Sequence, residues 1–142
     1  ISEGATSLPI TDEQMTRFWV TLRQGVDFVL SNLALMQGGE IFIPKIPSMT
    51  MVDFAKALAP ECDTHIVGIR PGEKLHECML TSDEALQSVE LDDRFAILPA
   101  TADCKNWNKS VKSSPLAKRL KYSSDINTEW LDANTLNIML AA

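Results

Sequence analysis

The sequence predicts an α/β fold, and two observations support this prediction. Segments with helical and extended patterns alternate along the chain, in the order helix, strand, helix, strand, helix, strand. The 142 residues are 45% hydrophobic and 23% charged, which is the ordinary composition of a globular chain that buries a sizeable core. This length fits one domain, but it is too short for a complete doubly wound domain with a cofactor site of its own.

The first predicted helix has one apolar face. Six apolar residues recur at helical spacing: Leu22, Val26, Val29, Leu30, Leu33 and Met36. Two capping boxes compete to start this helix, one at Thr11 and one at Thr21. A pair of glycines, Gly38 and Gly39, ends the helix and opens a strand over residues 40–43.

A second helix is predicted to begin after Thr50, which caps it, and to end before Pro60. Three of its residues are expected to face inward: Val52, Ala55 and Leu58. Residues 64–69 alternate polar and apolar side chains and predict a strand. A further capping box at Thr81 predicts a short helix through Val89, and residues 94–98 predict another strand.

The last third of the chain combines a basic stretch with a final helix. Residues 105–121 carry six basic residues and no acidic one, within a segment predicted to be a flexible connector over 100–121. This segment is either a solvated loop or a contact with an acidic neighbour such as another subunit. Beyond it, Leu131 and Leu136 form a hydrophobic staple around Asp132, which predicts the N-cap of a helix.

Charge and cysteine usage exclude several classes of function. The net charge of −6 argues against general nucleic-acid binding, and no apolar run approaches the roughly 20 residues of a membrane span. The three cysteines form no C-x-x-C pair, which indicates reduced thiols in a cytoplasmic protein. The spacing of the two histidines predicts no metal site.

A stiff, charged turn is the strongest functional signal. Arg70 and Glu73 flank Pro71-Gly72, directly after the strand-like run. Proline fixes its own φ and glycine accepts a positive φ, so the two charged side chains are held together. An arginine fork suits a diphosphate and a carboxylate suits ribose hydroxyls, which together describe a nucleotide-sugar.

Several motifs extend this interpretation to a family. They are LPITD (8–12) with MTRFW (15–19), GGEIFIPKIPS (38–48), GIRPGEKLHE (68–77) and YSSD (122–125). On these motifs the chain resembles the C-terminal part of the inverting UDP-N-acetylglucosamine 4,6-dehydratases, in the extended short-chain dehydrogenase/reductase superfamily. The resemblance implies the substrate-binding part of an extended Rossmann-type fold that lacks the dinucleotide-binding half. It divides the chain into a nucleotide-sugar-binding α/β portion (1–99), the connector (100–121) and a C-terminal segment with a short helix (122–142).

The resemblance also implies the residues of a substrate site. Arg17 and Arg70 would clamp the diphosphate, Glu73 would accept ribose hydroxyls, and the segment 7–10 would lie against the uracil. The implied binding set is Arg17, Arg70, Glu73, Pro71, Gly72, Ser7 and Leu8.

Structural alternatives stand beside these roles. Arg17 could pair with Asp12 or Glu13, and Arg70 with Glu73. Lys45 could reach a phosphate, although simple exposure is the favoured interpretation. Trp19 could stack on the base, but a core position is favoured because large aromatic residues beside a helix start usually pack inward.

No catalytic residue is expected in this chain. Its six glycines form no Gly-rich dinucleotide motif, and its one tyrosine, Tyr122, is followed four residues later by Ile126 where the family has lysine. NADP would therefore be bound by the N-terminal half, which the chain lacks. The resemblance implies that the strand over 40–43 and the helix after it pack on that half, so the chain alone should expose an apolar surface there. The chain also begins without Met, which is consistent with an excised piece.

The implied function is the UDP-sugar-binding portion of an NADP-dependent, C5-inverting UDP-N-acetylglucosamine 4,6-dehydratase, a lyase of surface or flagellin glycan biosynthesis. Its partner would be UDP-N-acetylglucosamine or a related UDP-sugar, with no nucleic acid and no membrane, in a cytoplasmic homo-oligomer of the full-length protein. The alternative is a stand-alone, non-catalytic module for nucleotide-sugar binding or assembly.

Overall fold

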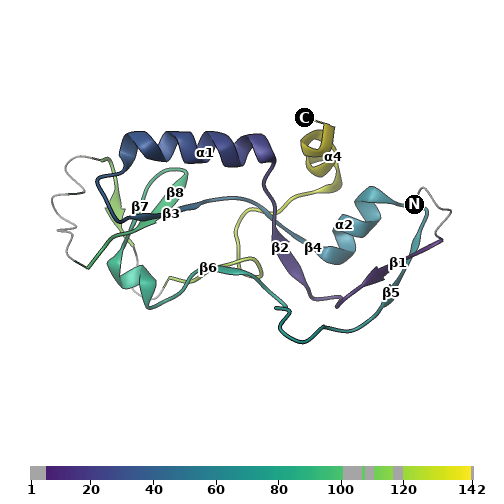
Figure 1. Ribbon diagram of the computed structural model, residues 1–142. Coiled ribbons are helices and arrows are strands. Elements are labelled where there is room, and N and C mark those ends of the chain that lie inside the picture. Colours follow the sequence, from purple (N-terminus) through teal and green to yellow (C-terminus); the bar gives the residue numbers. More distant parts are fainter. Residues whose placement is uncertain (1–5, 101–106, 108–110, 117–119, 142) are drawn as a thin grey trace. The chain divides into compact units, whose positions relative to one another are not determined.

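The computed structural model describes residues 6–100, 107, 111–116 and 120–141 (Figure 1). Its contacts divide the chain into two compact units, each made of separate segments. The first unit consists of Ile1–Thr21, Ile46–Glu77 and Ser123–Ala142, and the second of Leu22–Lys45 and Cys78–Tyr122. Both units contain helices and strands, so the predicted α/β class is confirmed. The predicted connector 100–121 falls largely outside the described residues, and the predicted division of the chain stays a prediction.

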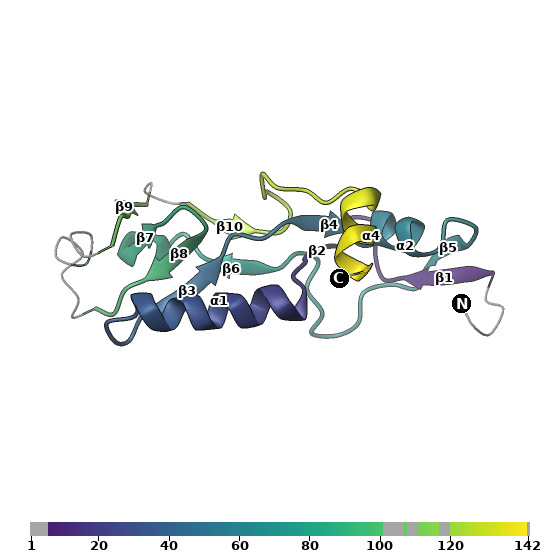
Figure 2. The same ribbon diagram turned by 90° about the horizontal axis from the view of Figure 1, so that it is seen from above.

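The first unit has two small sheets and two helices. Its elements are β1 (Ser7–Ile10), β2 (Thr16–Phe18), β4 (Ser48–Thr50), α2 (Met51–Leu58), β5 (Asp63–Ile66) and α4 (Ala133–Ala141). Strand β1 pairs in parallel with β5, and β2 pairs antiparallel with β4. Helices α2 and α4 lie side by side (Figures 1 and 2) and share a core. That core consists of Met49, Leu131 and Leu136, with Trp19, Phe54, Ala57 and Met139 packed against them.

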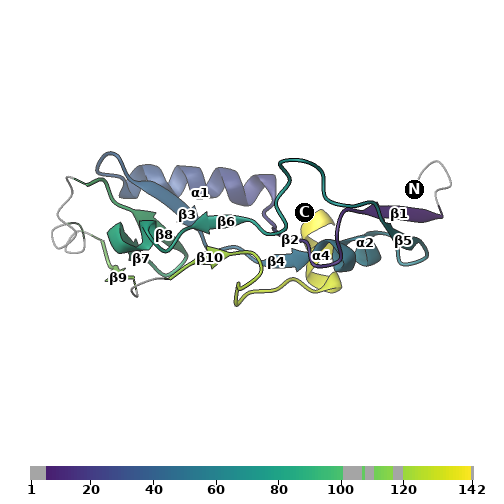
Figure 3. The same ribbon diagram turned by 90° about the horizontal axis from the view of Figure 1, so that it is seen from below.

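The second unit is built on an antiparallel sheet. Its elements are α1 (Leu22–Leu35), β3 (Ile41–Pro44), β6 (Cys78–Leu80), the 3₁₀ helix η1 (Glu84–Gln87), β7 (Ser88–Glu90), β8 (Arg94–Ile97), β9 (Ser114–Pro115) and β10 (Tyr122–Ser123). The sheet has the strand order β3-β8-β7-β9, and β6 pairs with β10 in a separate ribbon (Figure 3). Its core consists of Val89, Leu91, Ala96, Leu98 and Trp107.

Helix α1 leaves its apolar face uncovered. Between 49% and 86% of each residue on this face is exposed: Leu22, Val26, Val29, Leu30, Leu33 and Met36. The helix contacts its own unit through a different strip, Phe28, Asn32 and Leu35. Phe28 lies 4.7 Å from the guanidinium carbon of Arg94, Asn32 accepts a hydrogen bond from Arg94, and Leu35 packs against the core. This face is an exposed apolar surface on α1. The apolar surface expected on the strand over 40–43 and the helix after it stays a prediction.

Three of the predicted helix starts are confirmed, and the competing capping box at Thr11 starts no helix. Helix α1 begins after Thr21, as the second capping box predicts, and residues 15–20 are not helical. The hydroxyl of Thr50 accepts the N–H of Asp53 at 3.0 Å and caps α2. Asp132 accepts the N–H of Thr135 at 2.7 Å at the start of α4.

Other element predictions are wrong in part. Val89 does not end a helix, because it lies opposite Ala96 in the sheet and is only 1% exposed. The predicted strand over 64–69 ends at Ile66, since the chain turns at Gly68 with a φ of 87°. Leu58 is 42% exposed, because it sits on the last turn of α2 beside an open apolar hollow of about 240 Å³.

Candidate functional site

The turn from Arg70 to Glu73 has the predicted geometry. The N–H of Glu73 donates to the carbonyl of Arg70 at 3.0 Å, and Gly72 has a φ of 83°. A Pro-Gly turn with a positive φ at glycine is a type II turn. One carboxylate oxygen of Glu73 accepts the N–H of Arg70 at 3.1 Å, which stiffens the turn further. The second oxygen has no hydrogen-bond partner within the described residues and can accept one from a ligand.

The side chain of Arg70 is exposed and uncommitted. None of the residues that the structure describes forms a hydrogen bond or ion pair with its guanidinium. The alternative ion pair with Glu73 is therefore not formed, because Glu73 engages the backbone instead. An exposed arginine on a stiff turn can bind an anion without first giving up an internal partner.

The guanidinium of Arg17, in contrast, is hydrogen-bonded within the protein. Its Nη1 donates to the carbonyls of Thr16 at 2.7 Å and Leu75 at 3.1 Å, and its Nη2 donates to Lys74 at 2.8 Å. Its Nε lies 3.7 Å from the carboxylate of Glu77, so the predicted alternative partners Asp12 and Glu13 are not used. A guanidinium has five N–H groups, and these contacts leave one Nη2–H uncommitted. Arg17 thus ties β2 to the segment that follows the turn.

Ser7 and Leu8 lie on β1, next to β5. The hydroxyl of Ser7 is 2.7 Å from Nδ1 of His65 on the neighbouring strand. Leu8 lines the apolar hollow between β1 and α2. All of the predicted binding residues belong to the first unit, and the turn begins four residues after β5 ends.

A buried polar cluster, which sequence reasoning missed, lies where three of the motifs meet. Thr16 Oγ1 is 2.9 Å from Nδ1 of His76 and 2.7 Å from Oγ of Ser124. Thr16 and Ser124 are 4% and 0% exposed. The one available signal was that each residue falls inside a family motif, since isolated Ser, Thr and His residues carry no pattern of their own.

Two other residues are used structurally. The Nζ of Lys45 donates to Glu90 at 2.7 Å and to the carbonyl of Leu91 at 2.9 Å, and it lies 5.0 Å from the centre of the Phe95 ring. The favoured expectation that Lys45 is simply exposed is therefore wrong, because its charge is neutralised within the second unit. Trp19 stacks on Phe54 with ring centres 4.1 Å apart, which confirms its predicted core position.

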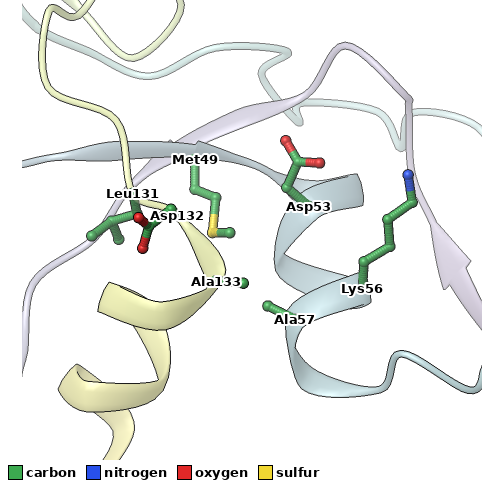
Figure 4. Close-up of a pocket in the computed structure, with 7 residues that line it drawn as sticks. All are labelled: Met49, Asp53, Lys56, Ala57, Leu131, Asp132 and Ala133. Atoms are coloured by element: carbon green, nitrogen blue, oxygen red, sulfur yellow. The ribbon is translucent and has the colours of Figure 1, made fainter.

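A separate hollow of about 360 Å³ opens between α2 and the start of α4 (Figure 4). Asp53, Lys56 and Asp132 line it together with the apolar side chains of Met49 and Leu131. The carboxylate of Asp53 accepts the hydroxyl of Thr50, the N-cap of α2, and the carboxylate of Asp132 caps α4. The hydrogen bond from the N–H of Thr135 lowers the pKa of Asp132 below its ordinary value. None of the predicted binding residues lines this hollow.

Metal-binding clusters and membrane-spanning helices are both absent from the described part of the chain. It contains no group of three His, Cys, Asp or Glu residues that could hold a metal ion. It also contains no helix with the length and apolarity to cross a membrane.

Comparisons with known proteins agree with this architecture. Residues 1–99 match the family model described as polysaccharide biosynthesis protein. The chain is 48% identical to a UDP-N-acetylglucosamine 4,6-dehydratase (inverting) of Campylobacter jejuni, over 96% of this chain and 42% of the relative. It is 36% identical to a UDP-glucose 4-epimerase of Rickettsia massiliae, over 94% of this chain and 40% of the relative.

A solved structure shows the same fold. The structure of Pen from Bacillus thuringiensis superposes with a TM-score of 0.77 and 28% identity, over 98% of this chain and 42% of that chain. The chain thus spans about two fifths of the length of the proteins it matches, and its mixed α/β structure is part of their longer fold.

Proposed function

The chain belongs to the polysaccharide biosynthesis protein family, and we propose that it is the UDP-sugar-binding portion of a C5-inverting UDP-N-acetylglucosamine 4,6-dehydratase. The observation that carries this proposal is the uncommitted guanidinium of Arg70 on the stiff turn that ends at Glu73. The 48% identity to an inverting dehydratase favours UDP-N-acetylglucosamine as the substrate.

Each residue of the turn would hold one part of the nucleotide. Arg70 would bind the diphosphate through two hydrogen bonds, and the open carboxylate oxygen of Glu73 would accept a ribose hydroxyl. Backbone groups around Ser7 and Leu8 would face the uracil. Arg17 would add at most one N–H, because its other donors are engaged inside the protein. Binding energy from the nucleotide would then orient the sugar for reaction elsewhere in the protein.

The residues of this chain do not fit a dinucleotide cofactor. The sequence has no Gly-rich strand-turn-helix, and lysine is absent from the position four residues after Tyr122. We therefore assign NADP and the reacting groups to a part of the full protein outside this sequence. We further propose that the full protein is a cytoplasmic homo-oligomer that serves surface or flagellin glycan synthesis.

Calorimetric titration with UDP and UDP-N-acetylglucosamine tests the proposal. Arg70→Ala is expected to weaken binding by about 2 kcal/mol or more, because a charge-assisted contact is lost. Arg23→Ala is the matched control, since Arg23 is also an arginine and its side chain is 89% exposed on α1. Absence of saturable binding to the folded chain, or equal weakening by both substitutions, would contradict the proposal.

A second experiment separates the enzyme portion from the stand-alone module. The chain would be fused in place of the matching region of the Campylobacter jejuni dehydratase. Loss of one water from UDP-N-acetylglucosamine, followed by mass spectrometry, would support the enzyme assignment. A folded fusion that binds UDP but does not react would favour the stand-alone module.

A further inference from the structure

Three buried or half-buried side chains, Thr16, His76 and Ser124, form one hydrogen-bonded group in the first unit, which we call the hydroxyl–imidazole cluster. We propose that this cluster positions the nucleotide-binding turn, Arg70–Glu73, and so sets the affinity for the diphosphate. The inference rests on the proposed function, and it assigns to the cluster a role in binding without contact with the ligand.

The cluster consists of closely spaced polar atoms. Thr16 Oγ1 lies 2.9 Å from Nδ1 of His76 and 2.7 Å from Oγ of Ser124. Ser124 Oγ also lies 3.2 Å from the carbonyl of Thr16 and accepts the N–H of Glu77 at 2.9 Å. Every polar side-chain atom at the centre of the cluster therefore has a partner. This matters because a buried hydroxyl without one is costly.

The cluster holds the residues that directly follow the turn. Ser124 and Glu77 exchange two hydrogen bonds, since the N–H of Ser124 donates to the carbonyl of Glu77 at 2.8 Å. On the other side, the N–H of Thr16 donates to the carbonyl of Leu75 at 3.1 Å. Residues 74–77 are thus fixed between β2 and the segment at Ser124.

Arg17 completes the same arrangement. It donates to the carbonyls of Lys74 and Leu75 and faces the carboxylate of Glu77. Lys74 is the residue next to Glu73, so the fixed segment begins where the turn ends. The rest of the turn, from Arg70 to Gly72, is exposed, so its position depends on this anchor at one end.

A polar anchor suits this purpose better than an apolar contact. Hydrogen bonds are directional, so a fully satisfied buried cluster selects one arrangement of the segments that it joins. An apolar contact of the same size tolerates sliding. A shift of the turn would move the guanidinium of Arg70 away from the phosphate oxygens, and good hydrogen bonds need a donor–acceptor distance of about 3 Å.

The test measures UDP affinity by calorimetry with the 142-residue chain. Thr16→Val and Ser124→Ala are each expected to weaken UDP binding about tenfold, which corresponds to about 1.4 kcal/mol. Thr16→Ser keeps the hydroxyl and should restore binding to within about twofold of the unaltered chain. The matched control is Thr81→Val, which removes a capping hydroxyl in the second unit and should leave UDP affinity unchanged.

A double-substitution cycle separates positioning from general destabilisation. If Ser124 acts through the turn, Ser124→Ala should have almost no effect on UDP affinity once Arg70→Ala is present. Should Ser124→Ala or Thr16→Val fail to fold, the half-buried His76 gives the same comparison, with His76→Phe expected to weaken binding and His76→Asn to retain it.

The outcomes distinguish the two proposals. Lack of UDP binding by the unaltered chain would contradict the proposed function, and the inference would fail with it. UDP binding that cluster substitutions leave unchanged would overturn the inference alone. Equal losses from Ser124→Ala with and without Arg70 would also overturn it, because they would show that the cluster does not act through the turn.

Discussion

At the scale of single residues, two arginines with the same predicted role have different environments. Arg17 donates three hydrogen bonds to backbone carbonyls, whereas the guanidinium of Arg70 has no partner among the described residues. The motif in which each arginine lies predicts that the arginine has a functional role. It does not predict which N–H groups of the guanidinium form hydrogen bonds inside the protein. For Arg17, these bonds depend on carbonyls 57 and 58 positions away in the sequence.

This difference predicts opposite effects of the same substitution. Arg17→Lys should lower the free energy of unfolding by about 1–3 kcal/mol, because lysine cannot reproduce the forked contacts and two half-buried carbonyls lose their donors. Arg70→Lys should change it by less than about 0.5 kcal/mol, as for other exposed positions. Urea unfolding of the two variants gives the comparison. Equal losses of stability would contradict the described environment of Arg17.

At the scale of the elements, helix α1 shows which features local sequence signals can predict and which depend on the folded chain. Its apolar face at Leu22, Val26 and beyond could be predicted from spacing alone. Its start could not, because capping boxes at Thr11 and Thr21 compete and only the family resemblance favours the second. The strip that it uses for packing, Phe28 with Asn32, could not, because the partner is the buried Arg94 on a distant strand. Val89 gives a second example. The capping box at Thr81 predicts a helix through this residue, but Val89 instead pairs with Ala96 as part of a strand in the sheet.

We expect that a charged residue can replace an apolar residue on the exposed face of α1 with little loss of stability. Leu30→Lys should change the free energy of unfolding of the chain by less than about 0.5 kcal/mol and reduce the binding of an apolar dye, because Leu30 is 59% exposed. Leu35→Lys is the matched control on the same helix, and it should cost about 2 kcal/mol or more because Leu35 packs against the core. A large loss from Leu30→Lys would show that this face is covered within the chain.

At the scale of the whole molecule, the predicted binding residues all come from one of the two units. That unit gathers three separate segments of the chain, and each of them carries part of a family motif. Its small sheets pair residues far apart in sequence, such as Ser7 with Asp63. This pairing places β1, which we propose to face the uracil, beside the strand that leads to the turn. The motifs alone could predict that these segments act together, but the buried link through Thr16 and Ser124 required the folded structure.

The central claim is that Arg70 recognises the diphosphate of a uridine nucleotide. The most direct test compares the affinities of the chain for UDP and for uridine, with Arg70 intact and in the Arg70→Ala variant. We predict that the unaltered chain prefers UDP by at least about tenfold, or about 1.4 kcal/mol, and that Arg70→Ala loses this preference. A preference that survives the substitution unchanged would contradict the claim.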